Sequence, residues 1–324
     1  MAIVLASTEG LSHEQWLGYR RMGIGGSDAS VICGVNKYKS PIELWMDKTG
    51  QLPFEEAGEA AYWGTTLESV VRDEFVKRTG LKVITVNEIL QSKEFPYMLA
   101  NLDGVLMCPT HGRCIFEAKT ASAYKAGEWD GDAVPHEYIL QVQHYCAVMG
   151  YAGAYVAALI GGNDFRWRFV ARDEDIISML IRTERDFWQH VIDDIPPPVD
   201  GSEACAKFLG QRFQNSVPKS TIELPDIAMS LIEQFNDARE QAEKYTEIKR
   251  ESENKLKQLL GTHEVGIIGG NSIRWQSISK KALDGKLLES EAPAIYDKYT
   301  RQSSYRRFTI TPARISQQEP RKAG

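Results

Sequence analysis

The spacing of apolar residues predicts amphipathic helices across the first 200 residues. Over residues 63–80 an apolar helical face is followed by Gly80, a residue type that commonly ends helices. Over residues 135–151 Pro135 stands at the helix start, where proline is tolerated. The two apolar faces are Leu67, Val70, Val71 and Phe75 in the first segment and Tyr138, Val142, Tyr145 and Met149 in the second. A helix, glycine turn and helix over residues 10–34, and a helix over residues 173–194, complete the set.

Short apolar runs between these helices predict strands. Three runs that follow one another resemble a meander, and two later runs form a hairpin across Gly161 and Gly162. The predicted strands are residues 81–90, 97–108 and 113–120 in the meander and residues 154–160 and 165–171 in the hairpin. Strands mixed with helices in this order predict an α/β fold with a mixed central sheet flanked by helices.

The triple proline at 196–198 predicts the end of this core, so the first domain is expected at residues 1–200 and an appendage at 201–324. A long charged helix is predicted over residues 226–260, and we expect it to pack on its own protein rather than in an intermolecular coiled coil. Its apolar seam comprises Leu231, Phe235, Ala238, Ala242 and Tyr245 and is interrupted at Lys249 and Ser252. Short strands are expected after Glu264, including residues 303–310, and then a frayed tail.

Composition excludes some classes of protein. The sequence has no apolar run long enough to cross a bilayer and no leader-like start, so we expect a cytoplasmic protein with no membrane partner. Five irregularly spaced cysteines indicate reduced thiols, and Cys108, His111 and Cys114 lack a fourth ligand for zinc. The net charge of −6 argues against a general nucleic-acid coating protein but permits a DNA enzyme with acidic metal ligands.

Candidate chemistry lies on the segment CIFEAKT. Glu117 and Lys119 are two residues apart on a predicted strand and therefore project from the same face. Asp103 precedes them across a turn short enough to place it beside Glu117. Hydrolysis of a phosphodiester requires hard oxygen ligands for Mg²⁺ and a group that orients water or stabilises charge. Asp103 and Glu117, with the carbonyl of Ala118, could hold the metal and Lys119 could supply the second function; a surface ion pair is the alternative.

Two further polar positions have more than one interpretation. Glu68 could face the same site, yet Thr65 and Glu68 also fit a helix capping box. Gln141 and Gln143 flank the apolar stripe of their helix on opposite sides, so at most one can reach the site.

The glycine-rich turn at residues 23–26 has the wrong spacing for a dinucleotide fingerprint. Backbone N–H groups at the following helix start, the Ser27 hydroxyl and either Arg20 or Arg21 could form an anion pocket. A turn that merely connects two helices is the alternative.

Five segments, in this order, resemble the YqaJ-type viral recombinase family, relatives of phage lambda exonuclease within the PD-(D/E)xK nuclease superfamily. They are WLGYRRMGIGGSDAS, LES, ANLDG, FEAKT and PHEYILQVQHY, and the resemblance spans residues 16–155. It implies a catalytic set of Glu68, Asp103, Glu117, Lys119 and Gln141, with Glu68, Asp103, Glu117 and the Ala118 carbonyl as metal ligands. It also implies that Arg20 and Ser27 hold a 5′ phosphate, although Met22 departs from the glycine of some relatives.

The resemblance further implies a 5′-to-3′ exonuclease on linear double-stranded DNA that exposes 3′ single strands for recombination. We expect Mg²⁺, with Mn²⁺ as a substitute, a homo-oligomer that is a trimeric ring, and a single-strand annealing protein as partner. An endonuclease or repair nuclease on the same fold, and a non-catalytic DNA-binding module, are the alternatives.

Overall fold

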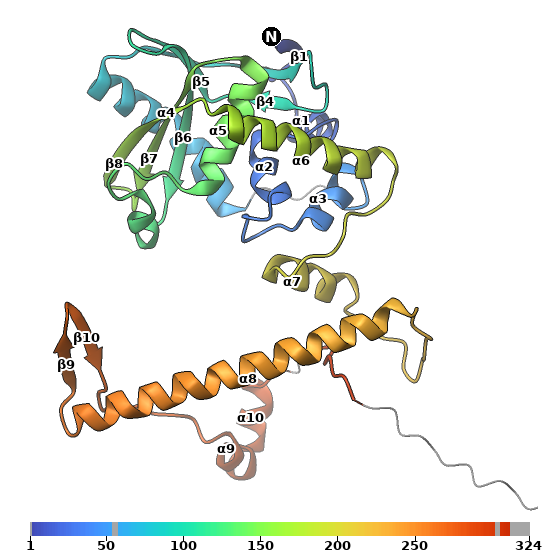
Figure 1. The fold of residues 1–324 in the computed structure, drawn as a ribbon, viewed down its shortest axis with the longest axis vertical. Coiled ribbons are helices and arrows are strands. Elements are labelled where there is room, and N and C mark those ends of the chain that lie inside the picture. The colour runs from blue at the N-terminus through green and yellow to red at the C-terminus, as the bar shows by residue number, and fades with distance from the viewer. Residues whose placement is uncertain (1, 54–57, 302–304, 312–324) are drawn as a thin grey trace, which may run out of the picture. The chain divides into compact units, whose positions relative to one another are not determined.

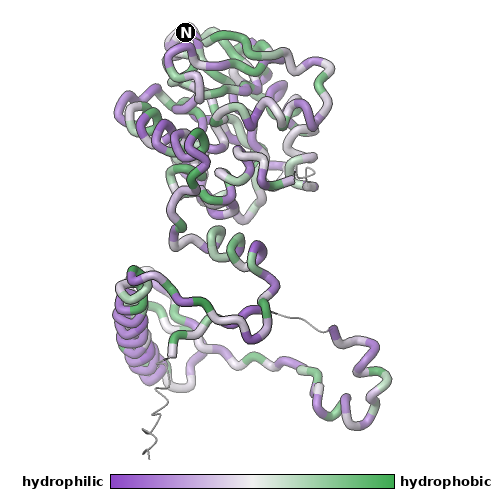
Figure 2. Tube along the Cα trace, turned by 90° about the vertical axis from the view of Figure 1, so that its right-hand side faces the viewer, coloured by the Kyte–Doolittle hydropathy of each residue, from purple (hydrophilic) through white to green (hydrophobic). Residues whose placement is uncertain are grey.

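The computed structural model describes residues 2–53, 58–301 and 305–311. The chain forms two units, Met1–Arg212 and Phe213–Gly324, which are described separately below. Apolar residues concentrate in the interior of the first unit, whereas the long helix of the second is largely hydrophilic (Figure 2).

A five-stranded mixed sheet forms the centre of the first unit (Figure 1). Its order is β2-β5-β6-β7-β8; β6 and β7 are parallel and the other neighbours are antiparallel. The strands are β2 (Val83–Ile84), β5 (Gly104–Cys108), β6 (Gly112–Ala121), β7 (Gly153–Ile160) and β8 (Asp164–Ala171). The predicted α/β fold with a mixed sheet flanked by helices, and the predicted hairpin, are therefore confirmed.

A second sheet, of order β1-β3-β4, corrects the predicted meander. It contains β1 (Ala2–Ser7), which was not predicted, β3 (Glu88–Ser92) and β4 (Leu99–Asn101). The stretches 81–90 and 97–108 each break and contribute to both sheets. The break arises because Leu90 is buried in the apolar cluster beneath α5, whereas Leu106 is buried against Phe75 on the other face of the main sheet. Apolar content alone does not specify which cluster a residue joins.

Helices cover both faces of the main sheet. On one face α4 packs Val71 and Phe75 against Phe116 of β6, and on the other α5 packs Val142 against Ile115. The helices of this unit are α1 (His13–Arg21), α2 (Gly26–Ile32), α3 (Pro41–Lys48), α4 (Glu59–Thr79), the 3₁₀ helix η1 (Ala123–Trp129), α5 (His136–Met149), α6 (Glu174–Ile192) and α7 (Glu203–Arg212).

Helix α4 starts earlier than predicted. Its N-cap is Gly58, so Thr65 and Glu68 lie inside the helix and the capping-box interpretation is wrong. Alanines at 60 and 61 favour helix and extend it towards the N-terminus. Val70, assigned to the apolar face, is 51% exposed, because Val71 and Phe75 alone turn directly onto the sheet.

The first unit extends beyond the boundary predicted at residue 200. Helix α7 belongs to it because Phe208 is buried in a cluster with Trp45 and Phe187. The prolines at 196–198 therefore precede a last helix of the core rather than end it.

The second unit contains α8 (Ile227–Leu260), a hairpin of β9 (Val265–Ile268) and β10 (Asn271–Arg274), α9 (Gly285–Glu291) and α10 (Pro293–Tyr299). The long helix is where the sequence predicts it, but α9 and α10 were not predicted. Residues 305–311 form no strand, contrary to the expectation for 303–310; positions 303 and 304 and the predicted frayed tail lie outside the described residues.

Among the described residues, Leu260 is the one buried residue of α8, and most of its apolar seam is exposed. The expectation that α8 packs on its own protein stays a prediction. No helix in the described ranges has the length and apolar character needed to cross a bilayer.

Candidate active site

The structure brings the two predicted carboxylates together at the middle strand of the main sheet. Gly104 pairs with Phe116 in the antiparallel ladder, so Asp103, just before β5, lies opposite Glu117 of β6. Asp103 Oδ2 accepts a hydrogen bond of 2.8 Å from the Ala118 N–H. The short β5–β6 turn thus produces the convergence that the sequence predicts.

Lys119 and Gln141 complete a hydrogen-bonded cluster around Glu117. Lys119 Nζ donates to Glu117 Oε1 at 2.6 Å and to Gln141 Oε1 at 3.0 Å. Gln141 Nε2 donates to the same Glu117 oxygen at 2.7 Å. The other glutamine, Gln143, bonds instead to the Ala171 carbonyl and the Asp173 N–H on the far side of α5. Of the two alternatives, Gln141 is the one that reaches this cluster.

Glu68 of α4 lines the same cavity. The cavity holds about 260 Å³ and is also bordered by Asp103, Glu117 and Lys119. Glu68 has Arg72, one turn further along α4, as a distant cationic neighbour at 3.9 Å. Its position in the third turn of α4, rather than at a cap, directs it towards the sheet.

The cluster contains more negative charge than its own cations balance. Burial and the neighbouring Asp103 raise the pKa of Glu117 to about 8 and that of Glu68 to about 7. Burial also raises the pKa of Asp103, although Lys119 and the Ala118 N–H oppose it. Burial disfavours the charge of Lys119, but Glu117 and Asp103 outweigh burial and raise its pKa. This shift favours the ammonium form of Lys119, which can donate hydrogen bonds.

These features fit a divalent cation. Glu117 Oε2 is buried without a hydrogen-bond partner, which is costly unless something else satisfies it. Carboxylate and carbonyl oxygens are the ligands that Mg²⁺ prefers. Among the described residues no group of three acidic, histidine or cysteine side chains is arranged to hold a metal ion by itself. Asp103, Glu117 and the Ala118 carbonyl would therefore share the ion with water, and Glu68 would act from across the cavity.

The raised carboxyl pKa values predict how the metal-free protein responds to pH. Unfolded glutamate has a pKa of about 4.3, so between about pH 4.3 and 8 the folded chain retains protons on Glu117 and Glu68 that the unfolded chain has lost. Stability must therefore fall as the pH rises through this window. We expect the Tm in chelator to fall between about pH 5 and 8, and Mg²⁺ to recover it at the upper end.

Thermal unfolding of wild type and Glu117→Gln, with chelator or with Mg²⁺, measures this effect. The variant lacks the main titrating group, so its Tm should change less with pH than that of wild type. Glu88→Gln, on the exposed start of β3, should show the same dependence of Tm on pH as wild type. Identical profiles for wild type and Glu117→Gln would contradict the raised pKa.

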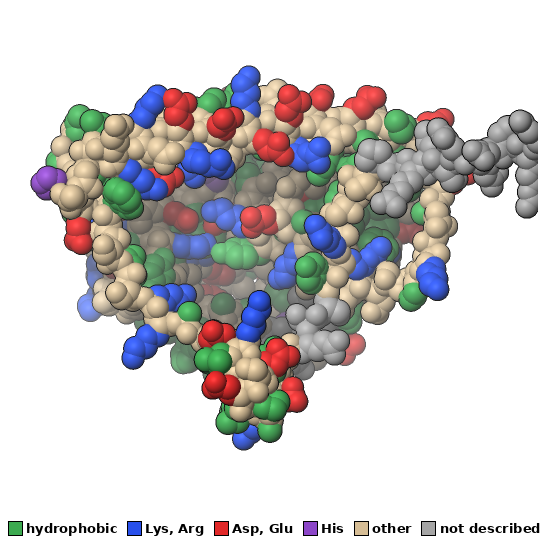
Figure 3. Space-filling view, turned by 90° about the horizontal axis from the view of Figure 1, so that it is seen from below, with side chains coloured by type: hydrophobic (Ala, Val, Ile, Leu, Met, Phe, Trp, Pro, Cys, Tyr) green, Lys and Arg blue, Asp and Glu red, His purple; other side chains and the backbone are tan. Residues whose placement is uncertain are grey.

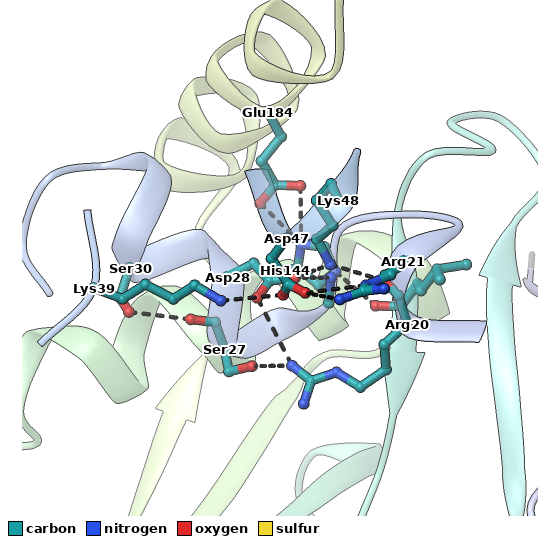
Figure 4. Close-up of polar contacts among 12 residues, drawn as sticks. Arg20, Arg21, Ser27, Asp28, Ser30, Lys39, Asp47, Lys48, His144 and Glu184 are labelled. Carbon is teal, nitrogen blue, oxygen red and sulfur yellow. Dashed lines mark hydrogen bonds and ion pairs between the residues drawn. The ribbon is translucent and has the colours of Figure 1, made fainter. Parts of the chain in front are cut away.

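A second cluster of polar residues surrounds the start of α2 (Figure 4). Arg20 Nη2 donates to Ser27 Oγ at 2.8 Å, and the Arg20 guanidinium lies over the Trp16 ring. Arg21 points elsewhere and donates to Asp47 and to the Leu52 carbonyl. Of the two arginines, Arg20 is the one placed beside Ser27.

The glycines of this turn serve packing more than anion binding. The Gly25 N–H donates to Asp28 Oδ2, so this predicted anion donor is already used. A Cβ at Gly26 would come within 2.5 Å of the Tyr145 ring on α5. Tyr145 Oη in turn accepts a hydrogen bond from Gln141. The absence of a side chain at 26 thus lets α2 lie against α5 and brings the Arg20–Ser27 pair close to the Glu117 cluster.

Two buried charged pairs near these sites were not predicted. Lys48 Nζ lies 2.7 Å from Asp28 Oδ2, and His144 Nδ1 lies 2.8 Å from Glu184 Oε1. Burial opposes the ionisation of Asp28, but Lys48 and Arg20 outweigh burial and hold its pKa well below the usual range. The one signal in the sequence was an acidic residue in the first turn of α2, which is equally typical of helix capping.

Comparison with known proteins places this chain in a family. A family model described as the YqaJ-like viral recombinase domain matches residues 15–152. The protein YqaJ of Bacillus subtilis (strain 168) is 40% identical over 313 residues, which are 95% of this chain and 97% of that protein. The chain belongs to the YqaJ-like viral recombinase family, as its motifs predicted.

Two solved structures have more distant similarity. The alkaline exonuclease LHK-Exo from Laribacter hongkongensis is 17% identical, with a TM-score of 0.47 over 61% of this chain and 97% of that one. A phage-related exonuclease from Haemophilus somnus 129PT is 12% identical, with a TM-score of 0.40 over 55% of this chain and 99% of that one.

Proposed function

We propose that this protein is a Mg²⁺-dependent nuclease that digests linear double-stranded DNA from its 5′ ends and leaves 3′ single strands for recombination. The observation that carries the nuclease assignment is the buried cluster of Asp103, Glu117 and Lys119, with one Glu117 oxygen unpartnered. The 5′-to-3′ direction and the link to recombination rest on the family resemblance.

Each residue of the cluster has a role that its contacts support. Asp103 and Glu117, with the Ala118 carbonyl and Glu68, would hold Mg²⁺ or its substitute Mn²⁺. When bound, the ion supplies Lewis-acid stabilisation of the phosphate and acidifies a water molecule. Lys119, whose ammonium form is favoured by the neighbouring carboxylates, would donate hydrogen bonds to the attacking water or to the phosphate oxygens. Gln141 bonds to both Glu117 and Lys119 and so orients the pair.

Incubation with linear and circular duplex DNA, in Mg²⁺ and in chelator, tests this proposal. We expect complete digestion of linear DNA in Mg²⁺, single-stranded intermediates with intact 3′ ends, and no cleavage of the circle. Cleavage of the circle would favour an endonuclease or repair nuclease. Binding without cleavage in Mg²⁺ and Mn²⁺ would favour a non-catalytic DNA-binding module.

We also propose that Arg20 and Ser27 bind the terminal 5′ phosphate. A guanidinium and a hydroxyl can form charge-assisted hydrogen bonds to a phosphate that a 5′ hydroxyl cannot reproduce. Wild type should therefore degrade 5′-phosphorylated ends about tenfold faster than 5′-hydroxyl ends at low DNA concentration. Arg20→Ala should remove this preference, because it should slow degradation from 5′-phosphorylated ends and leave the rate from 5′-hydroxyl ends unchanged.

Initial rates on matched duplexes with either end measure the ratio. Arg185→Ala, an exposed arginine of α6 paired with its neighbour Asp186, should retain the wild-type ratio. Equal rates on both ends in wild type would remove the Arg20–Ser27 pair from the proposed site.

The family resemblance also supports a trimeric ring that encloses DNA, and a single-strand annealing protein that receives the exposed strand. Enclosure favours repeated cleavage on one molecule, and closed cyclic symmetry is the usual way to form a ring from identical chains. Light scattering on a chain ending at Arg212, the limit of the first unit, tests whether this unit forms the ring.

A further inference from the structure

The apolar seam of α8 continues along the whole helix with alternating spacings of three and four residues. This heptad pattern spans residues 228–259, long enough for a coiled coil. The seam residues are Ala228, Leu231, Phe235, Ala238, Ala242, Tyr245, Lys249, Ser252, Leu256 and Leu259. Lys249 and Ser252 lie in register with the seam; they are polar members of it and do not end it.

The seam is open to solvent in the single chain. Tyr245 is 67% exposed and Leu259 is 84% exposed. The rest of the helix surface is mostly polar and charged apart from Ile227, Met229 and Ile248. Phe308 approaches Phe235 edge-on at 5.9 Å but leaves it 42% exposed. An apolar stripe of this length on a charged helix is typical of a helix that packs against another helix.

The order of large and small residues along the seam suits an antiparallel copy of the same helix. If two α8 helices cross midway between Glu243 and Lys244, four of the five facing pairs join a large residue with a small one, and Leu231 faces Leu256. The facing pairs are Ala242 with Tyr245, Ala238 with Lys249, Phe235 with Ser252, Leu231 with Leu256, and Ala228 with Leu259. Alternation of large and small residues across an interface allows close packing without voids.

A parallel pair in the same register fits poorly. Each residue would face its own copy, so Lys249 would meet Lys249 inside the seam, and Phe235 would be stacked on Phe235 next to an empty Ala238 layer. In the antiparallel pair the stem of Lys249 passes over the small Ala238, and its ammonium can reach water. A single lysine in a seam is a known means of selecting one helix arrangement over others.

The charges along α8 favour the same orientation. Residues 227–243 contain four acidic residues and one basic residue, whereas residues 244–260 contain five basic and three acidic residues. An antiparallel pair places the acidic half of one helix beside the basic half of the other, where opposite charges attract. A parallel pair places the two acidic halves together and the two basic halves together, where like charges repel. Figure 3 shows Lys and Arg side chains next to Asp and Glu side chains on the face that it draws.

We propose that two copies of this chain associate through α8 as an antiparallel two-stranded coiled coil. The interface consists of the seam residues and has its two-fold axis between Glu243 and Lys244. It does not depend on the proposed nuclease activity, and it joins chains whether or not the first units form a ring.

Cysteine crosslinking of the full-length chain tests the orientation. In a Cys33→Ser background, where the remaining native cysteines are buried, chains carrying Ala238→Cys and chains carrying Lys249→Cys are co-expressed with different tags. The antiparallel pair brings the two new thiols together, so mild oxidation should link differently tagged chains. Each variant expressed alone should not crosslink, nor should Glu247→Cys on the opposite face of α8. Crosslinking of either seam variant alone would show a parallel pair and overturn the proposal.

A charge swap provides a second measurement that does not require oxidation. Leu231→Lys should weaken association by about tenfold or more, since it places a charge in the seam. Adding Leu256→Glu to the same chain should restore association, because the ammonium introduced in one copy then faces the carboxylate introduced in the other at both contacts. Light scattering and sedimentation at several concentrations measure the assembly. If the double variant associates no better than the single one, or if wild type shows no association that Leu231→Lys reduces, α8 does not pair in this way.

Discussion

Lys119→Ala is expected to reduce the rate of DNA cleavage by about a thousandfold or more while leaving the fold and the binding of DNA ends intact. The ammonium group donates to Glu117 and Gln141 and is the one cation hydrogen-bonded to this carboxylate cluster in the described residues, so its removal takes away charge stabilisation at the reacting phosphate. Asp103→Ala should have a similar effect on cleavage, and it should also weaken Mg²⁺ binding because it removes a ligand.

Single-turnover cleavage, circular dichroism and end binding in chelator separate chemistry from folding. Lys93→Ala, on the exposed turn after β3, removes the same charge away from the site and should cleave at the wild-type rate. Wild-type cleavage by either Lys119→Ala or Asp103→Ala would show that the active site lies elsewhere.

Lys48→Met is expected to lower the free energy of unfolding by about 3–5 kcal/mol, because it leaves the Asp28 carboxylate buried without its main partner. The side chains of Lys48 and Asp28 are 2% and 8% exposed, and Lys48 also donates to the Arg20 carbonyl. Arg20 lies 3.7 Å from the other Asp28 oxygen and can compensate only in part. Because Arg20 is also the proposed phosphate ligand, the preference for 5′-phosphorylated ends should decrease as well.

Urea unfolding of three variants resolves the origin of this loss. Asp28→Asn/Lys48→Met should recover part of the stability, since neither charge is then left unpaired. Lys77→Met removes one of the two exposed partners of Glu74 on α4 and should change the free energy of unfolding by less than about 1 kcal/mol. If Lys48→Met lowers the free energy of unfolding by no more than Lys77→Met does, this would contradict a stabilising role for the buried pair.

Local patterns in the sequence were sufficient for the centre of the candidate site. The two-residue period of a strand places Glu117 and Lys119 on one face, and a short turn places Asp103 opposite Glu117. Both relations involve residues close in the chain, so they do not depend on how distant segments pack. The same holds for the apolar positions of α8 from Leu231 to Tyr245, whose spacing is set within one helix.

Only the tertiary structure decided the features that depend on distant segments. The structure shows that Gln141, and not Gln143, reaches the site. The sequence pattern could not choose between them, because α5 is buried on nearly all sides and its helical periodicity is therefore uninformative. The Asp28–Lys48 and His144–Glu184 pairs join residues from different helices, and burial makes such pairs stable only when both partners are present. The two-sheet arrangement has the same cause, since Leu90 and Leu106 are alike in the sequence and differ only in which helix covers them.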